Sequence, residues 1–192
     1  MKRLTLVTGI LALVAPLALA QTSAWTTDPA HSGVNFTIRH GGVSNVHGRF
    51  GGVTGTLIFN EADITKSTVT VTIDTSTVDT GEPARDTDLK SVAFFDVTKF
   101  PTASFTSSGV VKNGSKLTVN GNLTLHGVTL PVVLDVEGPS TPVEGAMDHK
   151  PHSGFSAATT ISRSAFGIGI SFPPIVVGDE VKLTIDLEIV KQ

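Results

Sequence analysis

The sequence predicts an all-β protein, an eight-stranded antiparallel barrel with one or two short helices. Apolar residues occupy every second position over several segments, and a strand built this way has one apolar face. Turn signals separate these segments at short intervals, which favours hairpins between strands adjacent in sequence. A sandwich is the alternative that the pattern leaves open. The alternation is most regular in the segments 68–74, 117–125, 128–136 and 181–189.

The first twenty residues are typical of a secretory signal peptide. Lys2 and Arg3 form a basic start, residues 4–13 are mostly apolar, and Ala18-Leu19-Ala20 fits a cleavage site. The apolar stretch is shorter than the roughly 20 residues that a bilayer span needs. We therefore expect cleavage near Ala20, a periplasmic or secreted protein without stable membrane insertion, and one domain over residues 21–192.

The charge balance and the cysteine content exclude several classes of function. Without residues 1–20 the chain has 12 basic residues against 17 acidic ones, a net charge of −5. This acidic balance disfavours nucleic acid as a partner and disfavours docking on anionic lipid. The sequence contains no cysteine, so disulfides, thiolate metal sites and cysteine nucleophiles are excluded.

The first half of the chain is predicted to hold several strands and a helix. Val34, Phe36 and Ile38 alternate with polar residues, and the run from Thr68 is the richest in β-branched residues. Pro83 suits a first helical turn. The predicted elements are a turn at 28–31, a strand at 34–38, a helical turn at 43–46, a glycine-rich β region at 49–59, a connection at 60–66, a strand at 68–77 and a short amphipathic helix at 82–95.

The second half is predicted to be a series of hairpins. Asn113-Gly114 is a strong hairpin signal, and His126-Gly127 forms a second tight turn. Clustered Pro and Gly residues indicate two irregular loops. The predicted elements are a turn at 96–101, a strand starting at Ala103, strands at 116–125 and 128–136, a loop at 139–154, a strand at 155–161, a loop at 166–178 and a last strand at 180–190.

Motifs for catalysis or metal binding are not evident. The histidines form no H-E-x-x-H or H-x-H pattern, and His149 and His152 are interpreted as exposed loop residues. There is no G-x-S-x-G motif, and Gly167-Ile168-Gly169 lacks the third glycine of a dinucleotide loop. We expect no catalytic residues, no metal ligands and no cofactor, and therefore no enzyme.

Four arginines lie beside predicted turns or helices: Arg39, Arg49, Arg85 and Arg163. Two roles are open for each of them. The guanidinium can donate to backbone carbonyls or pair with a nearby aspartate, or it can bind a polar head group at a barrel mouth. His126 is expected to hydrogen-bond to backbone near its turn.

A set of short segments is distributed along nearly the whole chain after residue 20: 38–40, 42–44, 48–50, 78–81, 85–86, 89, 91, 94–96, 100–101, 123–129, 131–132, 154–157, 166–167 and 177–181. Together, and in this order, these segments resemble the YceI-like family of exported, lipocalin-like, polyisoprenoid-binding proteins. Residues 139–153 show little likeness. The resemblance implies an eight-stranded barrel with an elongated apolar interior, an isoprenoid or similar amphiphilic lipid inside it, and no catalysis. It also allows a homodimer.

Composition supports a ligand independently, because a chain without Tyr and with Trp25 as its one Trp has few large rings to fill a barrel. The rival hypothesis is a packed, ligand-free barrel acting as an extracytoplasmic interaction or stress-response module. The candidate polar end of a ligand site is Arg39, Arg49, Arg85 and His126. The candidate apolar wall is Val34, Phe36, Ile38, Phe50, Val69, Val71, Ile73, Phe105, Phe155 and Ile161.

Overall fold

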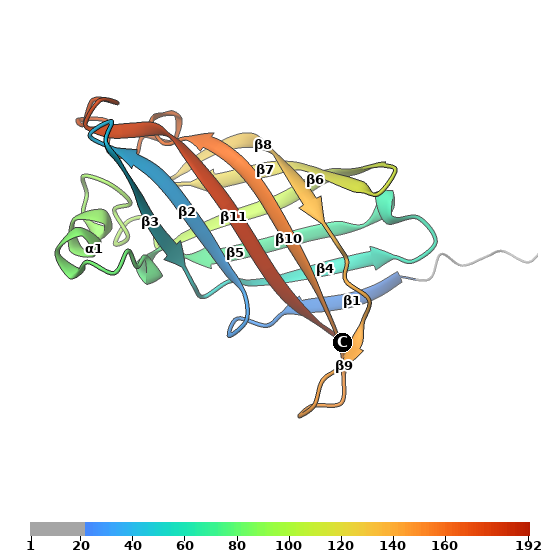
Figure 1. Ribbon diagram of the computed structural model, residues 1–192. Helices are drawn as coiled ribbons and strands as arrows, with labels where there is room; N and C mark the ends of the chain where they lie inside the picture. Colours follow the sequence, from blue (N-terminus) through green and yellow to red (C-terminus); the bar gives the residue numbers. More distant parts are fainter. Residues whose placement is uncertain (1–21) are drawn as a thin grey trace, which may run out of the picture.

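A computed structural model describes residues 22–192 as a sheet of eleven strands with one α-helix and three short 3-10 helices (Figure 1). The predicted signal peptide lies outside the described residues. The strands are β1 (Thr22–Thr27), β2 (Gly33–His40), β3 (Ser44–Phe50), β4 (Thr54–Asn60), β5 (Thr68–Asp74), β6 (Thr102–Asn113), β7 (Lys116–Leu125), β8 (Val128–Glu137), β9 (Val143–Glu144), β10 (Pro151–Ser162) and β11 (Val177–Lys191). The helices are α1 (Pro83–Lys90), η1 (Ile64–Lys66), η2 (Thr75–Thr77) and η3 (Ser164–Phe166).

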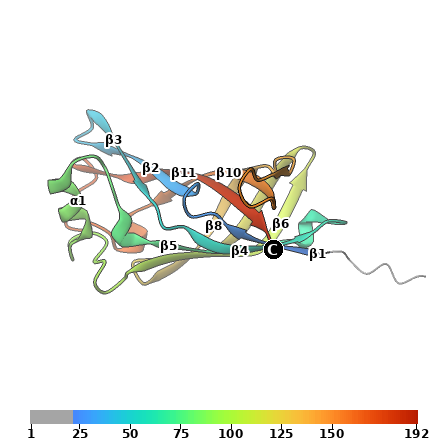
Figure 2. The ribbon, with the colours of Figure 1, turned by 90° about the horizontal axis from the view of Figure 1, so that it is seen from below.

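Eight of these strands close into an antiparallel barrel. Each is hydrogen-bonded to the next in the order β11-β1-β4-β5-β6-β7-β8-β10, and β10 pairs again with β11. The hairpin β2-β3 continues the wall beyond β1 and β4, toward the end where α1 lies (Figures 1 and 2). The predicted eight-stranded barrel is therefore confirmed, and the sandwich alternative is wrong.

Strand β11 forms the seam of the barrel. It pairs with β10 from Ser162↔Glu180 to His152↔Val190. On its other edge it pairs first with β2, from Val177 to Asp186, and then with β1, from Ile189 to Lys191. The bend at residues 28–32 separates β1 from β2, so these two strands cover successive parts of one edge.

The helix α1 lies across one end of the barrel, and β1 and the C-terminus lie toward the other (Figure 2). Glu82 caps the start of the helix: its side chain accepts a hydrogen bond from the Ala84 N–H, and Pro83 takes the first helical position. The helix ends at Lys90, earlier than the predicted 95, and the chain then turns so that the Phe95 N–H bonds to the Leu89 carbonyl. This turn brings Phe95 onto Phe50, with ring centroids 5.2 Å apart.

Three local predictions were wrong. Residues 43–46 do not form a helical turn: Gly41 and Gly42, both with positive φ, make a tight turn, and β3 begins at Ser44. The loop predicted at 139–154 contains β9, and β10 begins at Pro151 rather than at 155. The region 49–59 is split, because β3 ends at Phe50 and β4 begins at Thr54.

The inner face of the barrel is formed by the predicted alternation. On β11, Val181, Leu183, Ile185 and Leu187 face the interior, and on β7 the residues Leu117, Val119, Leu123 and Leu125 are buried. The strands predicted at 34–38, 68–77, 116–125, 128–136 and 180–190 are confirmed, with ends shifted by a few residues. Among the described residues, no helix has the length and apolar content needed to cross a membrane.

Candidate ligand cavity

The interior of the barrel contains two adjoining cavities. The helix-end chamber, about 320 Å³, is lined by residues of β2, β11, α1 and the 161–177 segment. The far chamber, about 140 Å³, lies among β4, β5, β7, β8 and β10. The two chambers meet at four residues that line both of them: Val34, Ile73, Leu123 and Leu183. The interior is therefore elongated and not solidly packed with side chains.

Polarity changes along this interior. The helix-end chamber is lined by Arg39, His40, Arg85 and Asp88 as well as by apolar residues. The far chamber is lined by aliphatic and phenyl side chains, apart from the small hydroxyl residues Ser67, Thr68 and Thr159. A molecule with an apolar chain and a polar end would therefore fit into this interior in one orientation, with its polar end beside α1.

Local hydrogen bonds fix two arginines at the helix end. Arg85 Nε donates to Thr80 Oγ1 at 2.8 Å, and its Nη2 donates to the Thr80 carbonyl at 3.0 Å. Arg39 Nη2 donates to the Gly42 carbonyl at 3.0 Å, and its Nη1 donates to Asn45 Oδ1 at 3.3 Å. Both guanidiniums are thus held by local hydrogen bonds at the edge of the chamber that they help to line.

Arg163 organises the loop that closes the chamber beside β11. Its side chain is buried, and its five N–H bonds all point to backbone carbonyls, so the structural role considered for this arginine is confirmed. Nε donates to Gly178 (2.9 Å), Nη1 to Ile168 (2.9 Å) and Gly169 (2.6 Å), and Nη2 to Phe172 and Val177 (2.7 Å each).

The carboxylate of Asp179, close to this arginine, holds the start of the loop by hydrogen bonds. Asp179 accepts hydrogen bonds from the Ser162 hydroxyl at 2.6 Å and from the Ser164 N–H at 3.0 Å. These bonds, with a smaller contribution from the charge of Arg163, hold the pKa of Asp179 below its ordinary value of 3.8. The carboxylate therefore stays ionised and ties β10 to the start of β11.

The structure brings all ten candidate wall residues to the two chambers. Their role in binding stays a prediction, since burial around a cavity is also what a barrel core requires. The far chamber is lined by Val69, Val71, Phe105 and Phe155, the helix-end chamber by Phe36, Ile38, Phe50 and Ile161, and both by Val34 and Ile73.

Of the four residues predicted for the polar end of the ligand site, two line a chamber and two do not. Arg39 and Arg85 line the helix-end chamber. Arg49 lies outside the chamber linings, with 70% of its side chain exposed and its Nε 3.9 Å from Asp79 Oδ2. His126 also lies outside them: its Nδ1 is 3.1 Å from the Phe166 carbonyl, and its ring packs edge-on against Phe100. The backbone bond expected for His126 is confirmed.

Sequence reasoning missed the aromatic side chains at the helix end. Phe94 and Phe172 stack with ring centroids 5.0 Å apart, and both line the chamber. Phe94 comes from the turn after α1, a stretch that was predicted to be the last part of the helix, and Phe172 comes from the irregular loop predicted at 166–178. His152 was also misjudged as an exposed loop residue, because it belongs to β10 and its side chain is 17% exposed.

A closed eight-stranded barrel with an elongated apolar interior and a polar mouth defines a lipocalin-like protein. The model of the YceI-like domain matches residues 25–189, and the chain belongs to this family. The protein YceI of Salmonella arizonae is 40% identical over 164 residues, which cover 84% of this chain and 83% of that protein.

Solved structures agree with this assignment. BcnA of Burkholderia cenocepacia has a TM-score of 0.73 at 25% identity, covering 84% of this chain and 98% of that one. The YCEI protein of Campylobacter jejuni has a TM-score of 0.70 at 32% identity, covering 78% and 87%. A polyisoprenoid binding domain from Saccharophagus degradans has a TM-score of 0.65 at 18% identity, covering 88% and 99%, and shares the fold.

Proposed function

We propose that this protein holds an isoprenoid or comparable long-chain amphiphile in its barrel, as a carrier, store or sequestering protein outside the cytoplasm. The observation that carries the proposal is the continuous apolar lining of the two chambers, joined at Val34, Ile73, Leu123 and Leu183. The polyisoprenoid named for the domain from Saccharophagus degradans supports the same ligand class. The predicted signal peptide supports the compartment.

Burial of apolar surface is sufficient to drive such binding. Each buried CH₂ contributes about 0.8 kcal/mol, so ten carbons contribute about 8 kcal/mol before the costs of ordering the chain. The polar end of the ligand would lie near Arg39 and Arg85, where guanidinium N–H groups can donate to oxygen atoms. This proposal needs no catalytic residue and no cofactor.

The test is native mass spectrometry of the exported protein, recovered from its own compartment, followed by organic extraction. We expect a stoichiometric mass increment and an extractable isoprenoid or fatty amphiphile. A protein that shows only its own mass, and still does so after incubation with isoprenoids, would refute the proposal and favour the ligand-free interaction module. The two chambers argue against that rival, which predicts a solidly filled barrel.

A further inference from the structure

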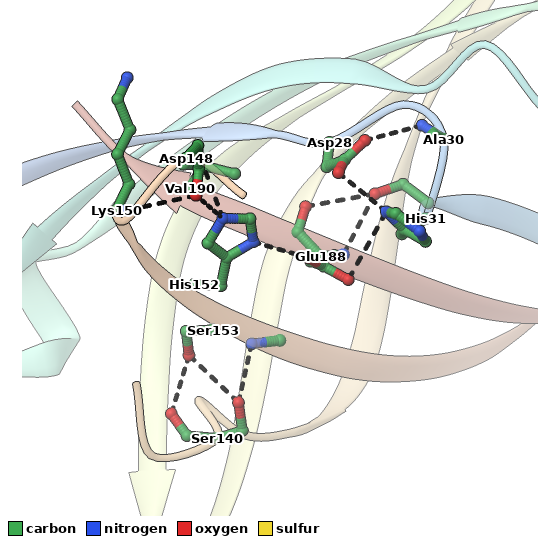
Figure 3. A network of polar contacts seen from close by, with 12 residues as sticks. Asp28, Ala30, His31, Ser140, Asp148, Lys150, His152, Ser153, Glu188 and Val190 are labelled. Atoms are coloured by element: carbon green, nitrogen blue, oxygen red, sulfur yellow. Dashed lines mark hydrogen bonds and ion pairs between the residues drawn. The ribbon is translucent and has the colours of Figure 1, made fainter. Parts of the chain in front are cut away.

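Three side chains of the kinds that bind metal ions lie together on the outer face of the barrel (Figure 3), and none of them lines the chambers. They are Asp28 and His31 from the bend between β1 and β2, and Glu188 from β11. His31 Nδ1 is 2.8 Å from Asp28 Oδ2 and 3.9 Å from Glu188 Oε2. One ligand atom from each of the three residues lies within 4.8 Å of the other two. Glu188 alternates with the inward-facing Leu187, so the group is separate from the proposed ligand cavity.

Backbone hydrogen bonds hold the two segments together independently of these side chains. The Asp28 N–H donates to the Glu188 carbonyl at 2.8 Å. The buried Ser32 hydroxyl donates to the same carbonyl at 3.3 Å and accepts from the Glu188 N–H at 3.1 Å. The bend is therefore fixed to β11 at the position of Glu188, so the backbone that carries all three side chains is held in place without them.

A second histidine orients the carboxylate of Glu188. His152 Nδ1 is 2.7 Å from Glu188 Oε1, and its Nε2 is 3.0 Å from Asp148 Oδ1. Because Oε1 is engaged by His152, the other oxygen, Oε2, is directed toward His31, as Figure 3 shows. Carboxylates that bind metal ions are themselves commonly held by hydrogen bonds from neighbouring groups, as Glu188 is here.

We propose that Asp28 Oδ2, His31 Nδ1 and Glu188 Oε2 bind a divalent transition metal of the zinc class. Ligand atoms around a tetrahedral zinc with bonds of about 2.1 Å lie roughly 3.4 Å apart, which is between the two distances from His31 Nδ1 given above. Two carboxylates balance the ion's charge, and the imidazole favours zinc-like ions over Ca²⁺ or Mg²⁺. A surface groove lined by His31, His152 and Glu188 lies beside the group and leaves room for a further ligand or water.

The test is calorimetric titration of Zn²⁺ into metal-stripped protein that was produced from the full sequence without a histidine tag. We expect one Zn²⁺ per chain. His31→Gln and Glu188→Gln should each weaken binding at least tenfold, and His152→Gln should weaken it about tenfold through the lost orientation of Glu188. The matched control is His149→Gln: His149 lies 3.0 Å from Glu144 on the neighbouring hairpin, outside the three-ligand group, and its loss should leave binding unchanged.

A second readout separates metal binding from effects on folding. In NMR spectra of the wild-type protein, Zn²⁺ should shift the ring resonances of His31 and leave those of His47 in place. Failure of Zn²⁺ to bind, binding that survives in His31→Gln, or shifts at His47 with none at His31 would each overturn the proposal. Ca²⁺ binding of equal strength to Zn²⁺ would overturn the assignment to a transition metal. None of these results depends on whether the barrel holds a lipid.

Discussion

The ring of Phe105 on β6 lies directly over Gly121 on the neighbouring strand β7. A Cβ at Gly121 would stand 2.3 Å from the Phe105 Cζ atom, far inside van der Waals contact. Phe36 lies over Gly48 in the same way, across the β2-β3 pair. In both places a glycine lets a large ring lie flat against the wall of the barrel, so that the ring lines the chamber without filling it.

Gly121→Ala is therefore expected to destabilise the protein. The added methyl group would force Phe105 out of its position, and overpacking of this kind costs about 1–3 kcal/mol of unfolding free energy. Denaturant titration followed by Trp25 fluorescence measures this cost. Gly109→Ala on β6 is the control, because a Cβ there meets nothing within 4 Å. Equal losses in the two variants would contradict the steric explanation.

Replacing Arg163 should be among the most damaging single changes in the chain. Arg163→Met removes a hydrogen-bond donor from each of five backbone carbonyls of the 168–178 segment. Unsatisfied buried acceptors cost about 1–3 kcal/mol each, so we expect a loss of more than about 3 kcal/mol in unfolding free energy. The exposed Arg49→Met should change it by less than about 0.5 kcal/mol in the same denaturant titration.

Asp179 should contribute to stability in a pH-dependent way. Its folded pKa is lower than its ordinary value of 3.8, so its contribution is present above pH 3.8 and is lost as the pH falls through the folded pKa. Asp179→Asn should thus be less stable than wild type at neutral pH, and this difference in stability should become smaller in acid. Thermal unfolding of both proteins, from neutral pH to below pH 3.8, measures this difference in stability. A difference in stability between wild type and Asp179→Asn that stays constant across this pH range would contradict the prediction.

Filling the far chamber should change which ligand chain length the barrel accepts. Val71 lines this chamber, so Val71→Phe should shorten the space available to an apolar chain. Loss of two buried CH₂ groups costs about 1.6 kcal/mol, which corresponds to a more than tenfold weaker affinity for a long isoprenoid. A short isoprenoid that stays in the helix-end chamber should keep its affinity. Fluorescence displacement assays with both chain lengths make the comparison.

The neighbouring Thr70 provides the matched control for this experiment. Its side chain is exposed on the opposite face of β5, so Thr70→Phe adds the same ring outside the barrel. Binding of both ligands should be unchanged. An equal loss in the two variants would contradict the assignment of Val71 to the chamber.

Alternation made most of the barrel predictable, because each apolar face on a strand has only the interior in which to be buried. Candidate wall residues such as Val71 and Ile73 could be chosen for that reason. Strand β1 was not predicted, since Thr22–Thr27 is short and Trp25 is its one large apolar side chain. Its pairing with β4 and β11 is a long-range contact, which local pattern does not encode.

The polar features were harder to predict for a physical reason. Arg163 gains its role from the carbonyls of a folded loop, and no spacing in the sequence marks those acceptors. Asp28 and His31 meet Glu188 only after β11 closes against the bend at 28–32. Side chains from opposite ends of the chain can be recognised as a group only once the register of the seam is known.

The seam also sets the order in which the barrel can form. β11 follows every other strand in the chain, and it pairs with β10, β2 and β1. A growing chain therefore exposes three unpaired strand edges until residues 177–191 are available, and such edges are where foreign strands attach. Closure joins the most distant parts of the sequence, which makes it a late and slow step of folding. A chain shielded from other strands until its final segment arrives would escape this hazard.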